Sequence, residues 1–203
     1  MKKRAAGAKI STRERILTCA MRLFQEKGVA EVRHVDIADA LKIAHPLVLY
    51  HFPTMRSIYT ESVTRILNDL RGVTTRALEP VAGNPKKLIA AYVKAPYDWA
   101  GKNPNFFSLF LFFYHLSACQ KEFRHLQTGI RETGRQRILT ILYEGVTKGD
   151  FKRPSADGLG LELLAFQIQA LITGSVIQCF TESGCNPKLK AQETSRLILK
   201  WLT

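Results

Sequence analysis

A short stretch in the first quarter of the chain is rich in side chains that can contact DNA. The imidazole of His45 can bond to a guanine or a phosphate, and the side chain of Leu47 or Leu49 can touch a thymine methyl group. The hydroxyl of Tyr50 can reach a phosphate oxygen. Such contacts require that these side chains lie together on the outer face of one short element.

Two short helices joined by a tight turn would present these side chains. Residues 36–41 place their apolar side chains at helical spacing, and the pattern then breaks. A second helix can begin near His45, because Pro46 in a first turn lacks only an N–H that would have no helical partner there. Val48 and Phe52, four residues apart, give this second helix an inward stripe. The arrangement is that of a helix-turn-helix whose second helix enters a major groove.

The segment IADALKIAHPLVLYHFPTMRSIY resembles the signature of the tetracycline-repressor (TetR) family, in which the recognition helix leads into a Tyr-His-Phe-Pro type motif and a long fourth helix. Residues 50–53 form that motif here, and residues 12–28 stand where the family's first helix belongs. The resemblance implies an all-α protein of about nine helices. A three-helix DNA-binding head would occupy residues 1–53, and a helical effector-binding and dimerisation body would occupy residues 54–203.

The chain departs from the family pattern at several positions. Lys42 stands where the family usually has Gly, and in a turn that needs positive φ a lysine would cost about 1 kcal/mol. Ala44 replaces the usual Ser or Thr cap of the recognition helix, and Met55 replaces a usual phosphate-contacting lysine. These changes leave the predicted fold intact, but the operator sequence of other family members cannot be assumed for this chain. By matching position, and by charge at the flanks, the candidate DNA-binding residues are Arg33, Lys42, His45, Pro46, Leu47, Leu49, Tyr50, His51 and Arg56.

The charge of the chain agrees with a polyanionic partner. A net charge of +13 suggests binding to nucleic acid or to an anionic membrane, although a solubilising surface would also explain it. Residues 1–53 hold 10 Lys and Arg against 5 Asp and Glu, so the basic excess is denser there than in the remaining chain. Residues 1–10 contain four of these basic residues and form either a mobile arm that lies along DNA or a frayed terminus without a role.

Capping signals place the other helices. Ser11 begins the first helix and Gly28 ends it, and Thr54 begins a fourth helix that continues to about Leu78. Three Asn-Pro pairs, in which Asn caps the helix and Pro takes its first position, start helices at about 85–100, 104–117 and 187–202. Two longer helices, at about 121–147 and 156–183, lie between them. No stretch alternates convincingly as a strand.

Aromatic residues are dense between positions 99 and 114. Aromatic side chains at helical spacing usually form an ordinary core, but the resemblance implies an effector cavity in this part of the chain. The effector would be apolar or aromatic. Arg124, Arg131 and Arg135 on the next helix either bind an anionic head group or form a solvated face. The candidate lining residues are Trp99, Phe106, Phe110, Phe113, Tyr114, His115 and Gln167.

The last two helices have broad apolar faces that need a covering surface. The resemblance implies that a second copy of the chain supplies it, in a four-helix dimer interface that sets two recognition helices about 34 Å apart over a palindromic operator. The candidate interface residues are Leu164, Ile168, Leu171, Ile172, Val176, Leu197, Ile198 and Trp201.

Other classes of protein find little support. The four cysteines lack a CxxC pair, which indicates free thiols in a reducing cytoplasm, and no apolar run resembles a signal peptide or a membrane span. One ExxH motif, from Glu122 to His125, and the pair His115 and Cys119 are too few ligands for a metal site. We therefore expect no enzyme activity and no cofactor. The expected function is a cytoplasmic, homodimeric, ligand-responsive repressor of transcription, and the alternative is a helical carrier of small molecules or lipids that binds no specific DNA.

Overall fold

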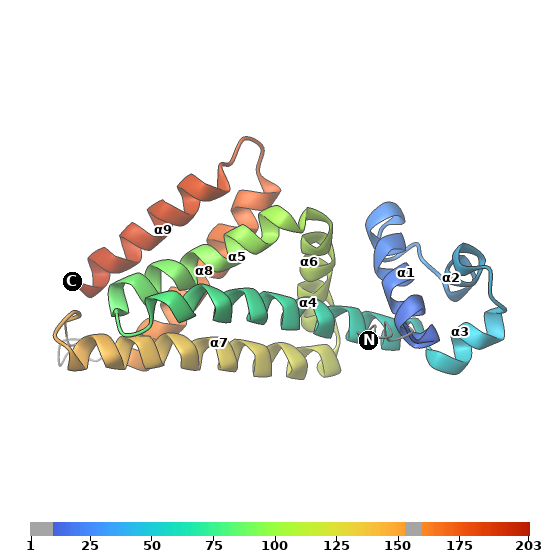
Figure 1. Ribbon diagram of the computed structural model, residues 1–203, viewed down its shortest axis with the longest axis horizontal. Helices are drawn as coiled ribbons and strands as arrows, with labels where there is room; N and C mark the ends of the chain where they lie inside the picture. Colours follow the sequence, from blue (N-terminus) through green and yellow to red (C-terminus); the bar gives the residue numbers. More distant parts are fainter. Residues whose placement is uncertain (1–9, 153–159) are drawn as a thin grey trace, which may run out of the picture.

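All regular secondary structure in the part of the chain that the computed structural model describes, residues 10–152 and 160–203, is helical, and this part contains no strand (Figure 1). The all-α prediction is therefore confirmed. The four basic residues Lys2, Lys3, Arg4 and Lys9, and the predicted helix start near residue 156, lie outside the described residues. The helices are α1 (Thr12–Lys27), α2 (His34–Leu41), α3 (His45–His51), α4 (Met55–Leu78), the 3-10 helix η1 (Glu79–Val81), α5 (Pro85–Lys102), α6 (Pro104–Cys119), α7 (Lys121–Thr147), α8 (Leu161–Thr181) and α9 (Pro187–Leu202).

The first three helices form a head at one end of an elongated molecule, and α4 leads from this head into the body (Figure 1). In the body α4 packs on α5, α7 packs on α6 and α8, and α9 packs on α5 and α8. Helix α1 packs on both α4 and α6, so the head contacts the body through two helices. The division of the chain into domains at residue 53 remains a prediction.

Most helices begin where the sequence predicts, because the expected caps form. Ser11, Thr54 and Asn84 each accept a hydrogen bond from the backbone N–H three residues ahead, at 3.1, 3.1 and 3.0 Å. Asn186 accepts from the N–H groups of Lys188 and Leu189. These bonds satisfy N–H groups that have no partner inside the helix.

Asn103 is an exception to the predicted caps. Its side-chain amide donates to the backbone oxygen of Trp99 at 2.8 Å, and it makes no cap bond to α6. The reason is that α5 continues to Lys102, so Asn103 lies between two helices and bonds to the end of the first. The prediction that the Asn103 side chain caps the helix after it is therefore wrong.

The turn between α2 and α3 has the backbone conformation that the sequence predicted. Lys42 has φ of 53°, and it is the one residue other than glycine in the left-handed region among those that the structure describes. A side chain in this conformation is strained by roughly 1–2 kcal/mol. The turn orients α3 relative to α2 and keeps this strain next to the candidate DNA-binding residues.

We predict that Lys42→Gly stabilises the protein by about 0.5–1 kcal/mol, because the relief of strain exceeds the entropy that glycine loses on folding. Urea unfolding followed by circular dichroism measures the change. Lys102→Gly is the control, because Lys102 is an exposed residue in the last turn of α5 and its replacement relieves no strain. Equal losses of stability in both variants would contradict the prediction.

Aromatic contacts join the head to the body. The ring of Tyr59 on α4 lies 5.0 Å from that of Phe24 on α1 and 6.0 Å from that of Phe112 on α6. The Tyr59 hydroxyl donates to the backbone oxygen of Val29 at 2.8 Å, which fixes the ring between the three helices. One cluster of buried residues extends from α1 in the head to α9 in the body. The head is thus packed on the body and is not attached by a flexible linker.

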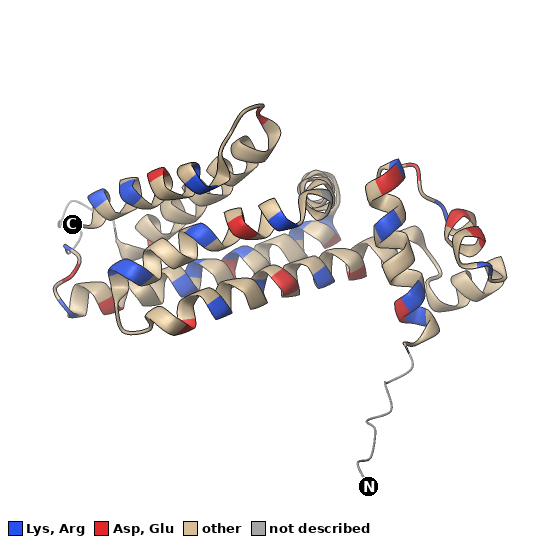
Figure 2. Cartoon of the chain, turned by 45° about the horizontal axis from the view of Figure 1, so that its top comes forward, with Lys and Arg blue, Asp and Glu red and all other residues tan. Residues whose placement is uncertain are grey.

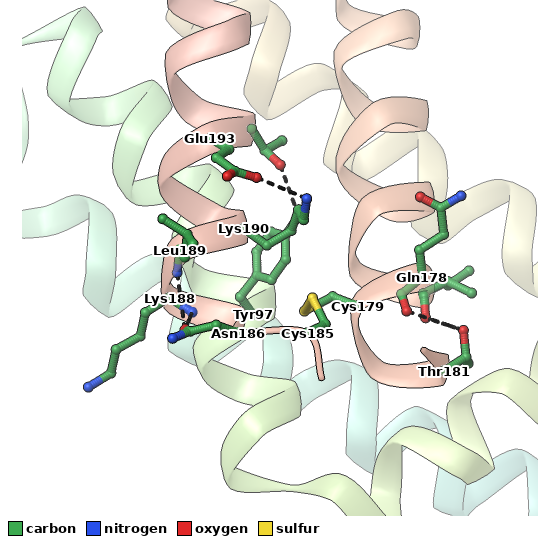
Figure 3. The surroundings of a disulfide bond; sticks show 12 residues. Tyr97, Gln178, Cys179, Thr181, Cys185, Asn186, Lys188, Leu189, Lys190 and Glu193 are labelled. Carbon is green, nitrogen blue, oxygen red and sulfur yellow. Dashed lines mark hydrogen bonds and ion pairs between the residues drawn. A yellow bond between two sulfur atoms is a disulfide. The ribbon is translucent and has the colours of Figure 1, made fainter. Parts of the chain in front are cut away.

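Cys179, in the last turn of α8, and Cys185, in the following turn, form a disulfide bond (Figure 3). The prediction that all four cysteines are free thiols is wrong for this pair and holds for the described Cys19 and Cys119. The turn reverses the chain at Gly184, whose φ is 77°, and brings the two Cα atoms to 5.2 Å. The two cysteines lie six positions apart in the sequence, so they do not form the CxxC pattern that would have indicated a disulfide.

Reduction of this disulfide should lower the stability of the protein by about 2 kcal/mol, since a cross-link that closes a short loop removes entropy from the unfolded chain. Unfolding with and without dithiothreitol measures the loss. Cys185→Ser should reproduce it, whereas the matched variant Cys119→Ser should not, because the Cys119 thiol is exposed and free. Peptide mass spectrometry without reductant tests whether the bond forms, and separate Cys179 and Cys185 peptides would contradict it.

Candidate nucleic-acid interface and internal cavity

Helix α2 is anchored at its first turn by Asp36. The carboxylate accepts a hydrogen bond from the ammonium group of Lys27 at 2.9 Å and one from the backbone N–H of Arg33 at 2.8 Å. Both interactions favour the charged form, the Lys27 bond most, so the pKa of Asp36 lies below its ordinary value. The end of α1 is thereby tied to the start of α2.

Helix α3 is held against α2 from two sides. Val48 and Phe52 are fully buried, as the inward stripe predicted. His34, at the start of α2, makes a hydrogen bond of 2.9 Å between its Nε2 and the backbone oxygen of Phe52. The guanidinium of Arg13 on α1 lies 4.6 Å from the centre of the Phe52 ring. The two short helices and α1 therefore form one rigid unit.

The outer face of α3 carries the candidate DNA-binding residues. Tyr50 is 79% exposed, and Leu47 and Leu49 are 38% and 37% exposed. Arg33, Lys42, His45, Pro46 and Arg56 are exposed as well. His51 is half-buried, and its ring lies edge-on to that of Tyr50 with centroids 5.2 Å apart. The structure thus brings these side chains to one end of the molecule, and their contact with DNA remains a prediction.

A cavity of about 260 Å³ lies between α4, α5, α6, α7 and α8. Three predicted lining residues, Trp99, Phe110 and Tyr114, belong to its wall. The indole N–H of Trp99 donates to the carboxylate of Asp69 at 2.8 Å, which fixes the ring. The rings of Phe110 and Tyr114 meet edge-on, with centroids 5.0 Å apart.

The other four predicted lining residues lie elsewhere. Phe106 faces α1 and α4, and Phe113 is fully buried in a separate cluster. His115 and Gln167 are exposed. The cause is the helical period of α6: residues 107, 110 and 114 share one face, and residues 106 and 113 share another. Because α6 has aromatic side chains on several faces, the sequence does not show which face meets the cavity.

Several polar residues of the cavity wall were not predicted. Tyr92, Gln127 and Gln169 line the cavity, together with Arg71 and Arg137. The amide of Gln169 donates to the backbone oxygen of Arg131 at 2.8 Å, and the hydroxyl of Tyr92 donates to that of Gly134 at 3.2 Å. Burial raises the pKa of Tyr92, so its hydroxyl remains protonated near neutral pH. The sequence does contain a signal for this polar lining, because Gln169 lies in the middle of the largely apolar helix α8.

The three arginines that the sequence suggested as anion ligands have different environments. Arg124 donates to the backbone oxygens of Ser117 and Ala118, at the end of α6. Arg135 pairs with Glu132. Arg131 alone of the three lines the cavity, where its guanidinium lies 5.3 Å from the centre of the Tyr114 ring.

The candidate interface residues of α8 and α9 are only partly available to a second chain. Ile168, Ile172, Val176 and Ile198 are buried within the single chain, and two of them, Ile172 and Val176, line the cavity. Leu164 and Leu171 are half-buried, whereas Leu197 and Trp201 are exposed. Further exposed apolar side chains on these two helices, not predicted, are Leu163, Phe166 and Leu189. Helix periodicity marks the apolar stripe of α8 but does not separate its core-facing side from its outward side.

Comparisons with known proteins agree with this architecture. Residues 16–61 match the family model described as bacterial regulatory proteins, tetR family. A putative transcriptional regulator from Saccharomonospora viridis, solved in complex with choline, is 26% identical with a TM-score of 0.79, over 92% of this chain and 94% of that chain. A bacterial regulatory protein in the tetR family from Rhodococcus RHA1 is 22% identical with a TM-score of 0.72, over 95% of this chain and 97% of that one.

A TetR transcription regulator from Haloarcula marismortui ATCC 43049 has the same fold, with 15% identity and a TM-score of 0.80 over 94% of this chain and 97% of that chain. No curated protein matches the sequence. The matched residues 16–61 contain α2, α3 and the first turns of α4, which carry most of the candidate DNA-binding residues. Residues 16–61, with the helix-turn-helix, thus match the TetR family of bacterial regulatory proteins, and the chain as a whole shares the fold of solved regulators of that family.

Proposed function

We propose that the protein is a cytoplasmic repressor that binds a palindromic operator as a homodimer and is released by a small effector in the internal cavity. The observation that carries the proposal is that one helix, α6, faces both the cavity and the head. Phe107, Phe110 and Tyr114 line the cavity, while Phe112 meets Tyr59, which packs on α1.

The coupling between the two sites follows from these contacts. An effector that displaces α6 also displaces the Phe112 ring, and Tyr59 transmits the displacement to α1 and to the start of α4. The two heads of a dimer would then no longer fit successive major grooves. Coupling of this kind typically amounts to about 1–3 kcal/mol, provided that the effector binds the two forms unequally.

Helix α8 supports the proposed dimer. It is largely apolar, yet only 28% of its most apolar stretch is buried inside the single chain. Leu163 and Phe166 on α8, and Leu197 and Trp201 on α9, remain exposed. The length and composition of α8 would also fit a membrane span, but in the structure it packs against α5, α7 and α9. A second copy of the chain would cover these side chains without a membrane.

Selection of bound duplexes from a random DNA pool tests the proposal, at about 0.15 M salt so that non-specific phosphate binding is weakened. We expect an inverted repeat whose half-sites are about one helical turn apart. Light scattering on the free protein should give the mass of a dimer. A monomer, or a pool without any repeat, would contradict the proposal. If the protein still bound small ligands, the alternative function of a helical carrier would be favoured.

A further inference from the structure

The charged side chains in the cavity wall all have the same sign. Among the described lining residues they are Arg71 on α4 and Arg131 and Arg137 on α7, and no Asp or Glu belongs to the wall. The carboxylate of Asp69 lies close by but accepts the indole N–H of Trp99 and is not part of the lining. Lys and Arg occur on both head and body (Figure 2), so overall composition alone does not reveal this local excess.

None of these three guanidinium groups forms a salt bridge with a described carboxylate, although nine other pairs do form among the described residues. Arg131 contacts the face of the Tyr114 ring, and Arg137 donates to the hydroxyl of Thr75 at 3.3 Å. Arg131 and Arg137 are both half-buried. Partly desolvated cations without a carboxylate partner favour the binding of an anion.

The other walls of the cavity, formed by α5, α6 and α8, are mainly apolar. α5 and α6 contribute Trp99, Phe107 and Phe110, and α8 contributes Ile172 and Val176. These side chains can bury the apolar or aromatic body of a ligand, whereas the arginines of α4 and α7 can bind its head. A guanidinium group has the planar shape that pairs with a carboxylate through two parallel hydrogen bonds.

We propose that the effector is an amphipathic organic anion, with an apolar or aromatic body and a carboxylate head that binds Arg131. This inference rests on the proposed function, in which the cavity holds the effector, and it specifies the chemical class of that effector. Its size is limited by the cavity volume of about 260 Å³, near the lower end of ordinary ligand pockets. A quaternary ammonium such as the choline held by the Saccharomonospora viridis regulator is the opposite class. Aromatic side chains attract such cations, but three guanidinium groups without a carboxylate in the wall repel them.

Three probes with one carbon skeleton test the inference: 4-phenylbutyrate, the neutral 4-phenylbutyramide and the cationic 4-phenylbutylamine. Binding to the full chain without DNA is measured by titration calorimetry at pH 7, with choline as a fourth probe. We expect the carboxylate to bind at least about tenfold more tightly than the amide, as a charge-assisted hydrogen bond implies, and both cations to bind more weakly still. Equal affinity for the amide, tighter binding of either cation, or no binding of any probe would overturn the proposal.

Two matched variants locate the head group. Arg131→Gln should remove the preference for the carboxylate, whereas Arg135→Gln, one turn further along α7, should retain it because Arg135 pairs with Glu132 and does not line the cavity. Circular dichroism confirms that both variants fold. An unchanged preference in Arg131→Gln would also overturn the proposal. Because no DNA is present, these outcomes are independent of the operator selection, so failure of the ligand class and failure of the regulator function are distinguishable.

Discussion

Tyr50→Ala should abolish operator binding at physiological salt while leaving the dimer and the fold intact. The ring projects from the outer face of α3 with 79% of its surface exposed, so its removal leaves no cavity in the core. A side chain that contacts DNA typically contributes about 1–3 kcal/mol, and a dimer on a palindrome loses that contribution in both half-sites. The combined loss is therefore about 2–6 kcal/mol, which weakens binding to the operator by roughly 30-fold to 10⁴-fold.

Electrophoretic mobility shift or anisotropy with the selected operator measures the loss. Tyr143→Ala is the matched control, because Tyr143 is also an exposed tyrosine but lies on α7, where its hydroxyl bonds to Glu162. The control should bind the operator as the unmodified protein does. Unchanged operator affinity in Tyr50→Ala would show that another face of the head meets the DNA.

Gly145→Ala should destabilise the protein by about 1–3 kcal/mol, although alanine normally strengthens a helix. A Cβ at position 145 would clash with Cδ2 of Phe151, whose ring covers the glycine. Phe151 is buried, and its backbone N–H donates to the Gly145 oxygen at 3.1 Å, so the ring cannot withdraw without disturbing the turn after α7. Chemical unfolding measures the effect.

Gly129→Ala is the matched control on the same helix. Apart from its chain neighbours and the backbone of its own helix, no described atom lies within 4 Å of a Cβ placed there, so this variant should gain about 0.5–1 kcal/mol. In a Phe151→Ala background the Gly145→Ala change should lose most of its cost, because the clashing ring is gone. Equal effects of Gly145→Ala in the two backgrounds would mean that contact with Phe151 does not cause the loss.

The sequence predicted the helices well because their start and stop signals are local. Ser11, Thr54, Asn84 and Asn186 cap helices through hydrogen bonds that span two or three residues, and such bonds depend little on the rest of the fold. Lys42 is a similar case, since the turn between two short helices requires its left-handed backbone.

The cavity and the disulfide depend on contacts between distant segments, which local patterns do not contain. Phe106 and Phe107 are adjacent and equally aromatic, yet only Phe107 meets the cavity, because the packing of α6 on α1 decides its orientation. Arg131 and Arg135 are one turn apart on α7. Arg135 forms an ion pair with Glu132, whereas Arg131 lines the cavity. The outward face of α3 was predictable because a helix with one buried stripe has one remaining side.

The two tryptophans of the chain give the protein two built-in fluorescent reporters. Trp99 is buried in the cavity wall and bonds to Asp69, so its emission responds to a ligand and to the local field of a bound anion. Trp201 is 46% exposed on α9, so its emission shifts to shorter wavelength when a partner chain excludes water from that face. Trp99→Phe and Trp201→Phe separate the two signals. One spectrometer can then follow effector binding and subunit association in the same sample without any attached label.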